Sequence, residues 1–244
     1  MLRMSLLVVL CLVVVAIQAW SPSASHRRRS TVPVLSLALI DQAEVAAKVA
    51  STDRGRKVSS EEREELETYF RELESRCTLP APARSPFVQG SWSVEYTDAS
   101  APSNGQLGPF AGFAYQVVDL ESGRYANVLK VPPNDWLTAT LEATWKEWDG
   151  VLIQDDSNHS NELTVSETPD RNQDYGATSW VVTFESLTIK IFGFPVLSQK
   201  FKNTKRVWRT TYVDENTRIV RAGRTGEKTD EMLFYMTRNT EEKT

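Results

Sequence analysis

The sequence predicts a mainly β protein, an antiparallel sandwich or barrel preceded by an amphipathic helix. The first observation is the alternation of apolar and polar residues in LTATLEATW, residues 137–145, which is the period of a strand with one buried face. The second is a series of similar short runs separated by turn-forming segments such as ESG, PPND and DENT. The third is that no glycine-rich phosphate loop follows any of these runs, which argues against a nucleotide-binding α/β fold.

The composition suits one soluble domain with additional segments at the N-terminus. Residues 1–40 carry four arginines and no acid, so the rest of the 244-residue chain holds 24 basic and 32 acidic residues, a net charge of −8. A body this acidic is a poor nonspecific binder of nucleic acid. The two histidines, His26 and His159, are far apart and offer little for a zinc site or a catalytic triad. We therefore expect no metal, no cofactor and no catalytic residue.

The N-terminus predicts two successive targeting segments. Residues 1–19 combine Arg3 with an apolar stretch too short to span a bilayer comfortably, which is typical of a signal peptide. Residues 20–36 are rich in Ser and Arg and lack acids, as transit peptides are. The pair resembles the bipartite presequences of algae whose plastid has extra membranes, which implies import into the plastid. Plain secretion is the alternative, and the sequon Asn158-His159-Ser160 would favour it.

Residues 37–80 predict a helical N-terminal region, and residues 81–240 predict the β domain. Ser59 followed by Glu62 forms a capping box at the start of a long helix. Apolar residues then recur at helical spacing and form one stripe, which we expect to pack against the β domain. The stripe contains Leu66, Tyr69, Phe70, Leu73 and Cys77. A membrane-surface helix is the alternative, but its polar face consists mostly of Glu, which anionic lipid repels.

Many short runs beyond residue 81 have strand character, and eight strands are enough to enclose one small ligand in a barrel. Turn-formers such as TPDRNQDYG separate them. The expected strands are SWSVEYT, FAYQVVDL, RYANVLKV, LTATLEATW, GVLIQD, NELTVSE, SWVVTFESLTIKIF, RVWRTTYV, RIVRA and EMLFYMTR.

Three motifs occur in an order that resembles the plastid lipid-associated protein family, also called plastid fibrillins. They are G-x-W-x-x-x-Y-T (Gly90, Trp92, Tyr96, Thr97), D-x-x-x-G-x-x-x-N (Asp119, Gly123, Asn127) and Y-V-D-x-x-x-R-I-x-R (Tyr212, Val213, Asp214, Arg218, Ile219, Arg221). The resemblance implies a lipocalin-like β-barrel without enzymatic activity. It also implies binding of prenylquinones, carotenoids or acyl lipids at thylakoids or plastoglobules. The chain departs from the pattern after Arg221, where Ala222 precedes Gly223 and a polar segment follows.

Within such a barrel we expect a set of ligand-binding residues from several strands. They are Trp92, Tyr96, Tyr115, Val117, Asn127, Trp208, Tyr212 and Arg221. Arg221 shares strand parity with Ile219, so it faces the interior if Ile219 does. A buried guanidinium needs a partner, and Glu95, Asp119 or a polar ligand group could supply one. The alternative is that Arg221 lies at the barrel mouth and reaches water.

The charged segment around Asp214 and Arg218 has two interpretations, an active site or a hairpin turn held by an ion pair. General acid–base chemistry needs a group whose pKa is tuned by burial or by a coupled charge. Asp and Asn suit a tight turn, and turn tips are usually wet. We therefore expect Asp214 and Arg218 to form a structural clasp.

A basic and apolar segment follows residue 189. Residues 190–228 carry ten Lys and Arg against three acids, and IKIFGFPVLSQKFK suggests an exposed apolar loop. We expect Phe192, Phe194, Lys200 and Lys202 to contact an anionic membrane surface. A solvated basic face is the alternative. For the whole protein, a module that supports a plastid lipid-biosynthetic enzyme and an enzyme on a calycin-like barrel remain the other hypotheses.

Overall fold

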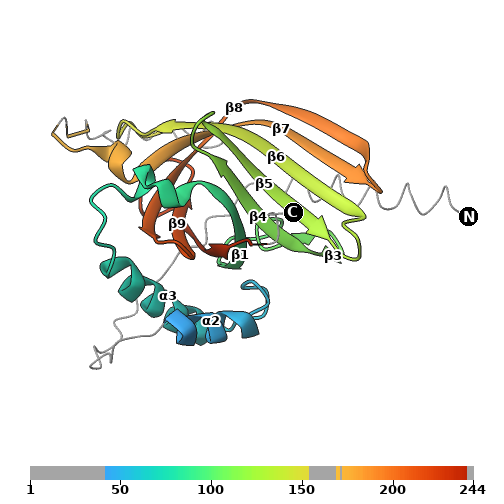
Figure 1. Cartoon of the computed structure of the whole chain (residues 1–244), viewed down its shortest axis with the longest axis horizontal. Helices are drawn as coiled ribbons and strands as arrows, with labels where there is room; N and C mark the ends of the chain where they lie inside the picture. Colours follow the sequence, from blue (N-terminus) through green and yellow to red (C-terminus); the bar gives the residue numbers. More distant parts are fainter. Residues whose placement is uncertain (1–41, 154–168, 171, 241–244) are drawn as a thin grey trace, which may run out of the picture.

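A computed structural model of the chain describes residues 42–153, 169–170 and 172–240 (Figure 1). Eight antiparallel strands close into a barrel in the order β1-β10-β9-β8-β7-β6-β5-β4, and β2 and β3 form a separate two-stranded sheet. The strands are β1 (Gly90–Thr97), β2 (Gln106–Leu107), β3 (Phe110–Ala111), β4 (Phe113–Asp119), β5 (Arg124–Val131), β6 (Leu137–Glu147), β7 (Ser179–Ile191), β8 (Phe194–Val213), β9 (Thr217–Gly223) and β10 (Met232–Arg238). The predicted antiparallel barrel is confirmed.

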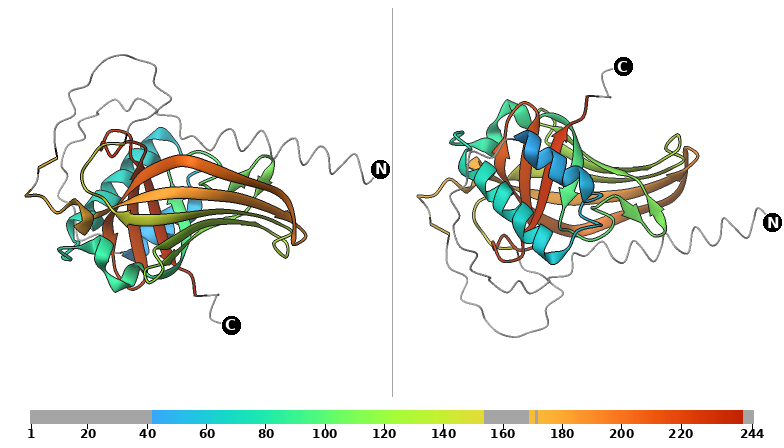
Figure 2. Two further views of the ribbon diagram at one scale, coloured as in Figure 1. Left: turned by 90° about the horizontal axis from the view of Figure 1, so that it is seen from above. Right: turned by 90° about the horizontal axis from the view of Figure 1, so that it is seen from below.

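Two helices precede the barrel, α2 (Gln42–Ser51) and α3 (Ser60–Ser75). The predicted capping box forms, because the Ser59 hydroxyl accepts from Glu62 N and the Glu62 carboxylate accepts from Ser59 N. Both helices lie across β1, β10 and β9 on the outside of the barrel (Figure 2). Short 3₁₀ helices at Pro82–Arg84 and Pro86–Val88 carry the chain from α3 into β1.

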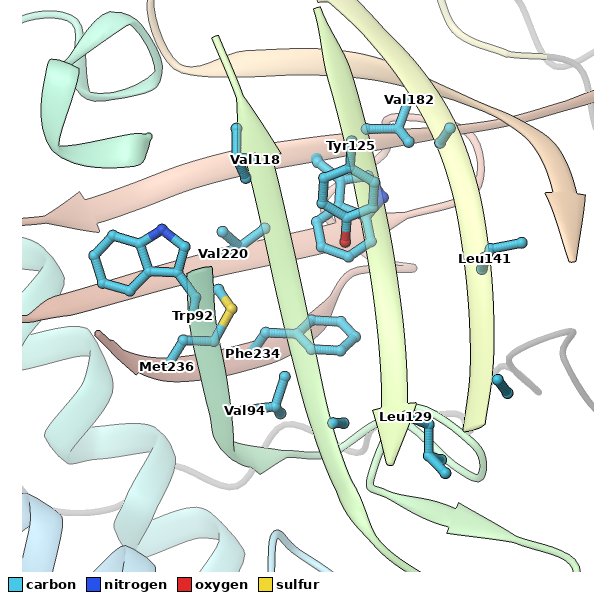
Figure 3. Packing of buried hydrophobic residues seen from close by; sticks show 14 of the residues in the cluster. Trp92, Val94, Val118, Tyr125, Leu129, Leu141, Val182, Val220, Phe234 and Met236 are labelled. Carbon is cyan, nitrogen blue, oxygen red and sulfur yellow. The ribbon is translucent and has the colours of Figure 1, made fainter. Parts of the chain in front are cut away.

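The buried residues fall into two clusters on opposite faces of the barrel wall. One cluster fills the interior, with Trp92, Val182 and Leu141 among its members (Figure 3). The other lies between the helices and the outer face of β1, β9 and β10, where Phe70 packs 5.3 Å from the Tyr96 ring and 5.2 Å from the Tyr235 ring. Strands β9 and β10 are therefore buried on both faces. The alternation of apolar and polar residues in the sequence does not predict this, because it assumes one exposed face.

One end of the barrel is closed by the first motif. Trp92 is fully buried and its indole N–H donates to the Val88 carbonyl at 3.0 Å. The Arg238 guanidinium lies over the Trp92 ring, 3.8 Å from its centroid, and donates to the Phe87 carbonyl. Gly90 has a φ of +110°, which only glycine adopts readily. The residues of the G-x-W motif thus close this end of the barrel.

Strands β6, β7 and β8 extend beyond the part of the barrel that the helices cover (Figures 1 and 2). At this far end β7 and β8 are joined by a hairpin turn, and β6 begins beside it. The sequence suggested a loop around residues 192–202, but β8 starts at Phe194 and only Phe192 and Gly193 form the turn. The GVLIQD run was also predicted as a strand, yet its described part, up to residue 153, has no strand. The NELTVSE run and the two targeting segments lie outside the described residues.

Candidate functional site

A cavity of about 80 Å³ lies inside the barrel, at the end opposite Trp92. Its wall is mostly apolar and includes Val94, Leu129, Phe184 and Phe234. The exposed Ser100, in the loop after β1, belongs to the same wall, so the cavity reaches the surface there. The start of β4, the start of β10 and the β7–β8 turn all share this end, because neighbouring strands are antiparallel.

Three of the eight predicted ligand-binding residues line this cavity: Tyr115, Asn127 and Trp208. The Trp208 ring packs 5.3 Å from Phe234 and 5.2 Å from Tyr125, between centroids. Asn127 accepts a hydrogen bond from the Tyr125 hydroxyl. Tyr115 contributes to the wall although its ring lies under Lys130, whose Nζ is 5.5 Å from the ring centroid.

Four other predicted ligand-binding residues lie away from the cavity. Trp92 plugs the opposite end of the barrel. A register shift after Val94 turns Tyr96 outward, against the helices. Val117 alternates with the buried Gln116 and Val118 and so takes the outward face. Tyr212 packs beside the helices, and its hydroxyl donates to Asp214 at 2.7 Å.

Arg221, the last of the set, is buried but on the outer face of the barrel. Its Nε and Nη2 donate to the two carboxylate oxygens of Glu74 on α3 at 2.7 and 2.9 Å, and Nη1 lies 3.1 Å from a Glu67 oxygen. Burial lowers the pKa of Arg221, and its bonds to Glu74 and Glu67 reverse this, so the pKa is raised overall. The predicted partners Glu95 and Asp119 are wrong, because Ile219 and Arg221 face the helices rather than the interior.

The predicted clasp between Asp214 and Arg218 does not form. Asp214 holds its own turn instead, accepting from Asn216 N at 2.8 Å and from Thr217 N at 2.7 Å. Arg218 points into the barrel and is fully buried, and its three guanidinium nitrogens have no hydrogen-bond partner within the described residues. Burial lowers the pKa of Arg218 to about 10, so the side chain carries its charge at neutral pH.

Besides Arg218, three interior side chains in the described residues carry unpaired polar atoms, and of these only Trp208 is a predicted site residue. Gln116 is 1% exposed and lines the cavity, yet neither its amide oxygen nor its amide nitrogen has a partner in the described part of the chain. The same holds for the indole nitrogens of Trp180 and Trp208. The signal for Gln116 was available, because it shares strand parity with Ala114 and Val118 in FAYQVVDL.

Tyr125 connects these groups. It is buried among the interior side chains (Figure 3). Its hydroxyl donates to Asn127 in the cavity wall, and its ring packs against Trp208. Burial raises the pKa of Tyr125 well above its ordinary value, and the positive charge of Arg218 opposes the shift. The interior therefore holds a positively charged, donor-rich region next to the apolar cavity.

The tip of the β7–β8 hairpin exposes two aromatic side chains. Phe192 is 73% exposed and Phe194 is 74% exposed, and Lys200 and Lys202 are exposed on the adjoining part of β8. The basic residues later in the sequence do not extend this exposed basic surface, because Arg209 pairs with Glu231 and Arg221 pairs with Glu74. The expected basic face is thus confined to the hairpin and its neighbourhood.

Neither a metal site nor a membrane-spanning helix is found in the residues that the structure describes. No group of three or more His, Cys, Asp or Glu side chains is placed to hold a metal ion there. None of the described helices has the length and apolar character needed to cross a bilayer.

Comparison with known proteins agrees with the motifs. No curated protein matches the chain. A family model described as PAP_fibrillin matches residues 42–228, which span both helices and the barrel through β9. The match covers more than half of the chain, and the three motifs fall within it. The chain belongs to the PAP/fibrillin family.

Proposed function

We propose that this protein is a noncatalytic lipid-binding barrel of the plastid. It binds one end of hydrophobic molecules such as prenylquinones, carotenoids or acyl lipids in its cavity and associates with thylakoids or plastoglobules. The observation that carries the proposal is the cavity, which has a mostly apolar wall and reaches the surface beside the loop at Ser100. Cavities with apolar walls and a few polar groups are the usual form of small-molecule sites.

The exposed hairpin tip supports association with a lipid surface. Phe192 and Phe194 would enter the apolar layer while Lys200 and Lys202 meet anionic headgroups. The tip lies at the same end of the barrel as the cavity mouth. A docked barrel would therefore present its mouth towards the surface that holds its ligand.

Titration with a plastoquinone analogue tests the cavity, since Trp208 in its wall reports on occupancy by fluorescence. Saturable quenching is expected. Ala222→Phe fills the cavity and should abolish saturation, whereas Ala126→Phe, on a β5 residue outside the cavity lining, should not. Mass spectrometry of lipids carried by protein purified from its native membranes would then identify the ligand. Quenching that never saturates, or that Ala222→Phe leaves unchanged, contradicts the proposal.

A second function has one observation in its favour. A groove of about 620 Å³ lies outside the barrel, lined by the segment after α3 and by β8, with Leu79, Pro80, Trp148 and Tyr175 among its residues. A groove of this size could receive a segment of a plastid lipid-biosynthetic enzyme. Protein from native membranes that carries such an enzyme in stoichiometric amount and no lipid would favour this function over the first.

A further inference from the structure

Two of the unpaired polar side chains inside the barrel belong to the wall of the cavity. Gln116 and Trp208 belong to the cavity wall, and their buried donors have no partner in the described residues. Buried polar groups are almost always hydrogen-bonded in proteins, because leaving them unpaired is costly. Two unpaired groups in the wall of one cavity therefore indicate a ligand with a hydrogen-bonding head.

Arg218 adds a charge to these donors. It is fully buried on β9, its Cζ lies 5.7 Å from the centroid of the Trp180 ring, and Trp180 also has an unpartnered indole N–H. The other buried charged side chain in the described part of the protein, Arg221, faces outward and is paired with Glu74. No described interior carboxylate compensates the guanidinium, and an uncompensated buried charge is strongly unfavourable.

The cavity and Arg218 are connected through Trp180 and Trp208. The Arg218 guanidinium lies 5.7 Å from the Trp180 ring, and Trp180 is the cross-strand neighbour of Trp208 in the cavity wall. Tyr125 packs against the same Trp208 ring and donates to Asn127, another wall residue. Arg218 is thus one layer of side chains away from the cavity. Its field favours negative charge in the part of the cavity that Trp208 lines.

We infer that the barrel binds an apolar chain that ends in a carboxylate, and that this molecule enters head first. The carboxylate accepts from Gln116 Nε2 and Trp208 Nε1 in the field of Arg218, and the chain runs past Met232 to the mouth. The inference rests on the proposed function, since it requires that the cavity take apolar molecules. A neutral head, such as a quinone carbonyl or an ester, would satisfy the donors but leave the charge of Arg218 uncompensated.

The size of the cavity agrees with this mode. A volume of about 80 Å³ holds a carboxylate and the first few methylene groups. The remainder of a long chain would lie at the mouth, beside the loop that contains Ala99 and Pro102. Recognition would therefore be concentrated on the head and would be largely insensitive to the far end of the chain.

The test compares three ligands with the same sixteen-carbon chain, the free acid, its methyl ester and the alcohol, on the delipidated full chain at pH 7.5. We expect the acid to bind at least tenfold more tightly than the ester or the alcohol. Arg218→Met should lower the affinity for the acid to that of the ester and leave the ester unchanged. Arg218→Lys, which keeps the charge, should retain part of the preference for the acid.

The stability of the ligand-free protein is a second readout. If Arg218 only stabilised the fold, its substitution would lower this stability instead of raising it. Arg218→Met removes an uncompensated charge, so the midpoint of urea unfolding should rise. A fall in the midpoint would show that Arg218 holds the fold through Trp180, and it would overturn the inference. Gln116→Leu should weaken the acid, the ester and the alcohol alike, because each head accepts from the same amide, and the ligand comparison on the unmodified protein stands whether or not a variant folds.

The outcomes separate this inference from the proposed function. If acid, ester and alcohol all bind saturably with equal affinity, the barrel binds lipids but the carboxylate site is wrong. If none of them binds, both the proposed function and the inference fail. An alkyl phosphate of the same chain length, titrated beside these three ligands, distinguishes the kind of anion, and tighter binding of the phosphate than of the acid would overturn the assignment to a carboxylate.

Discussion

Arg218 and Arg221 lie three positions apart on β9, so they point to opposite faces of the barrel wall. The sequence pattern predicts Arg221 inside and Arg218 at the turn, whereas Arg218 points into the barrel and Arg221 lies on its outer face, paired with Glu74. The prediction is wrong because the burial of Ile219 does not mean that it faces the interior. Here α3 buries the outer face of β9 as well, so an apolar residue can be fully buried on either face.

The ion pair of Arg221 predicts a large loss of stability on substitution. Arg221→Met leaves Glu74 without its cation and Glu67 paired with the exposed Arg71. Removing one partner of a buried ion pair typically costs about 3–5 kcal/mol. Arg71→Met is the matched control, since Arg71 pairs with the same Glu67 at 2.8 Å but is 66% exposed, and it should cost about 0.3–0.5 kcal/mol. Urea unfolding measures both, and equal losses would contradict a buried role for Arg221.

The lowered pKa of Arg218 predicts the pH dependence of its cost. The folded pKa of about 10 lies below the ordinary pKa of arginine, so above pH 10 the unfolded chain binds more protons and folding becomes more favourable as pH rises. Below pH 10 the full cost is present, about 3 kcal/mol at 1.36 kcal/mol for each pH unit of the shift. The stability gained by Arg218→Met should therefore be constant from pH 6 to 9 and shrink above pH 10. A gain that does not change up to pH 11.5 would contradict the assignment.

Among the elements, the β7–β8 hairpin is the one whose conformation the sequence pattern predicts least accurately. The sequence suggested an apolar loop, because Phe192, Gly193, Phe194 and Pro195 read as turn-like. Pairing with β7 instead keeps the segment extended to its tip, with Ile191 opposite Phe194. The two Phe side chains are consequently held on a strand-supported turn, where they remain exposed.

This hairpin predicts how the protein attaches to lipid. The double substitution Phe192→Ser and Phe194→Ser should reduce binding to vesicles of galactolipid and phosphatidylglycerol more than tenfold, because each buried Phe contributes about 1.5–3 kcal/mol. Phe87→Ser is the control, since Phe87 is 43% exposed near the plugged end and should have no effect. Co-sedimentation gives the ratio, and equal binding of all three proteins would exclude the hairpin as the contact.

At the scale of the whole molecule, the sequence predicted the class of fold and the capping box but not the contents of the barrel. Period-two runs identify strands, and the spacing of Leu66, Phe70 and Leu73 identifies the packed face of α3. Which strands pair, where the register shifts and which polar side chains meet inside depend on contacts between distant segments. Gln116 and Arg218 are 102 positions apart, so neither could be linked to the other from local pattern.

Closure of the barrel depends on its last strand. A chain ended after residue 228 lacks β10, which removes Phe234 and Met236 from the interior and Leu233 and Tyr235 from beneath the helices. We expect this truncation to lose cooperative thermal unfolding, measured by circular dichroism. A chain ended after residue 240 keeps β10 and should unfold as the full chain does.

The pairing of β1 with β10 also sets an order of events during synthesis. Trp92 lies opposite Arg238, so the first and last strands of the ring come from segments 146 positions apart. Contacts this distant in sequence form late and slow folding, and a chain leaves the ribosome from its N-terminus. Until β10 emerges, β1 and β9 each have an edge without its neighbour, and such edges invite pairing with other chains. The nascent protein is thus most prone to aggregate just before its synthesis ends, when a chaperone that covers strand edges would help it most.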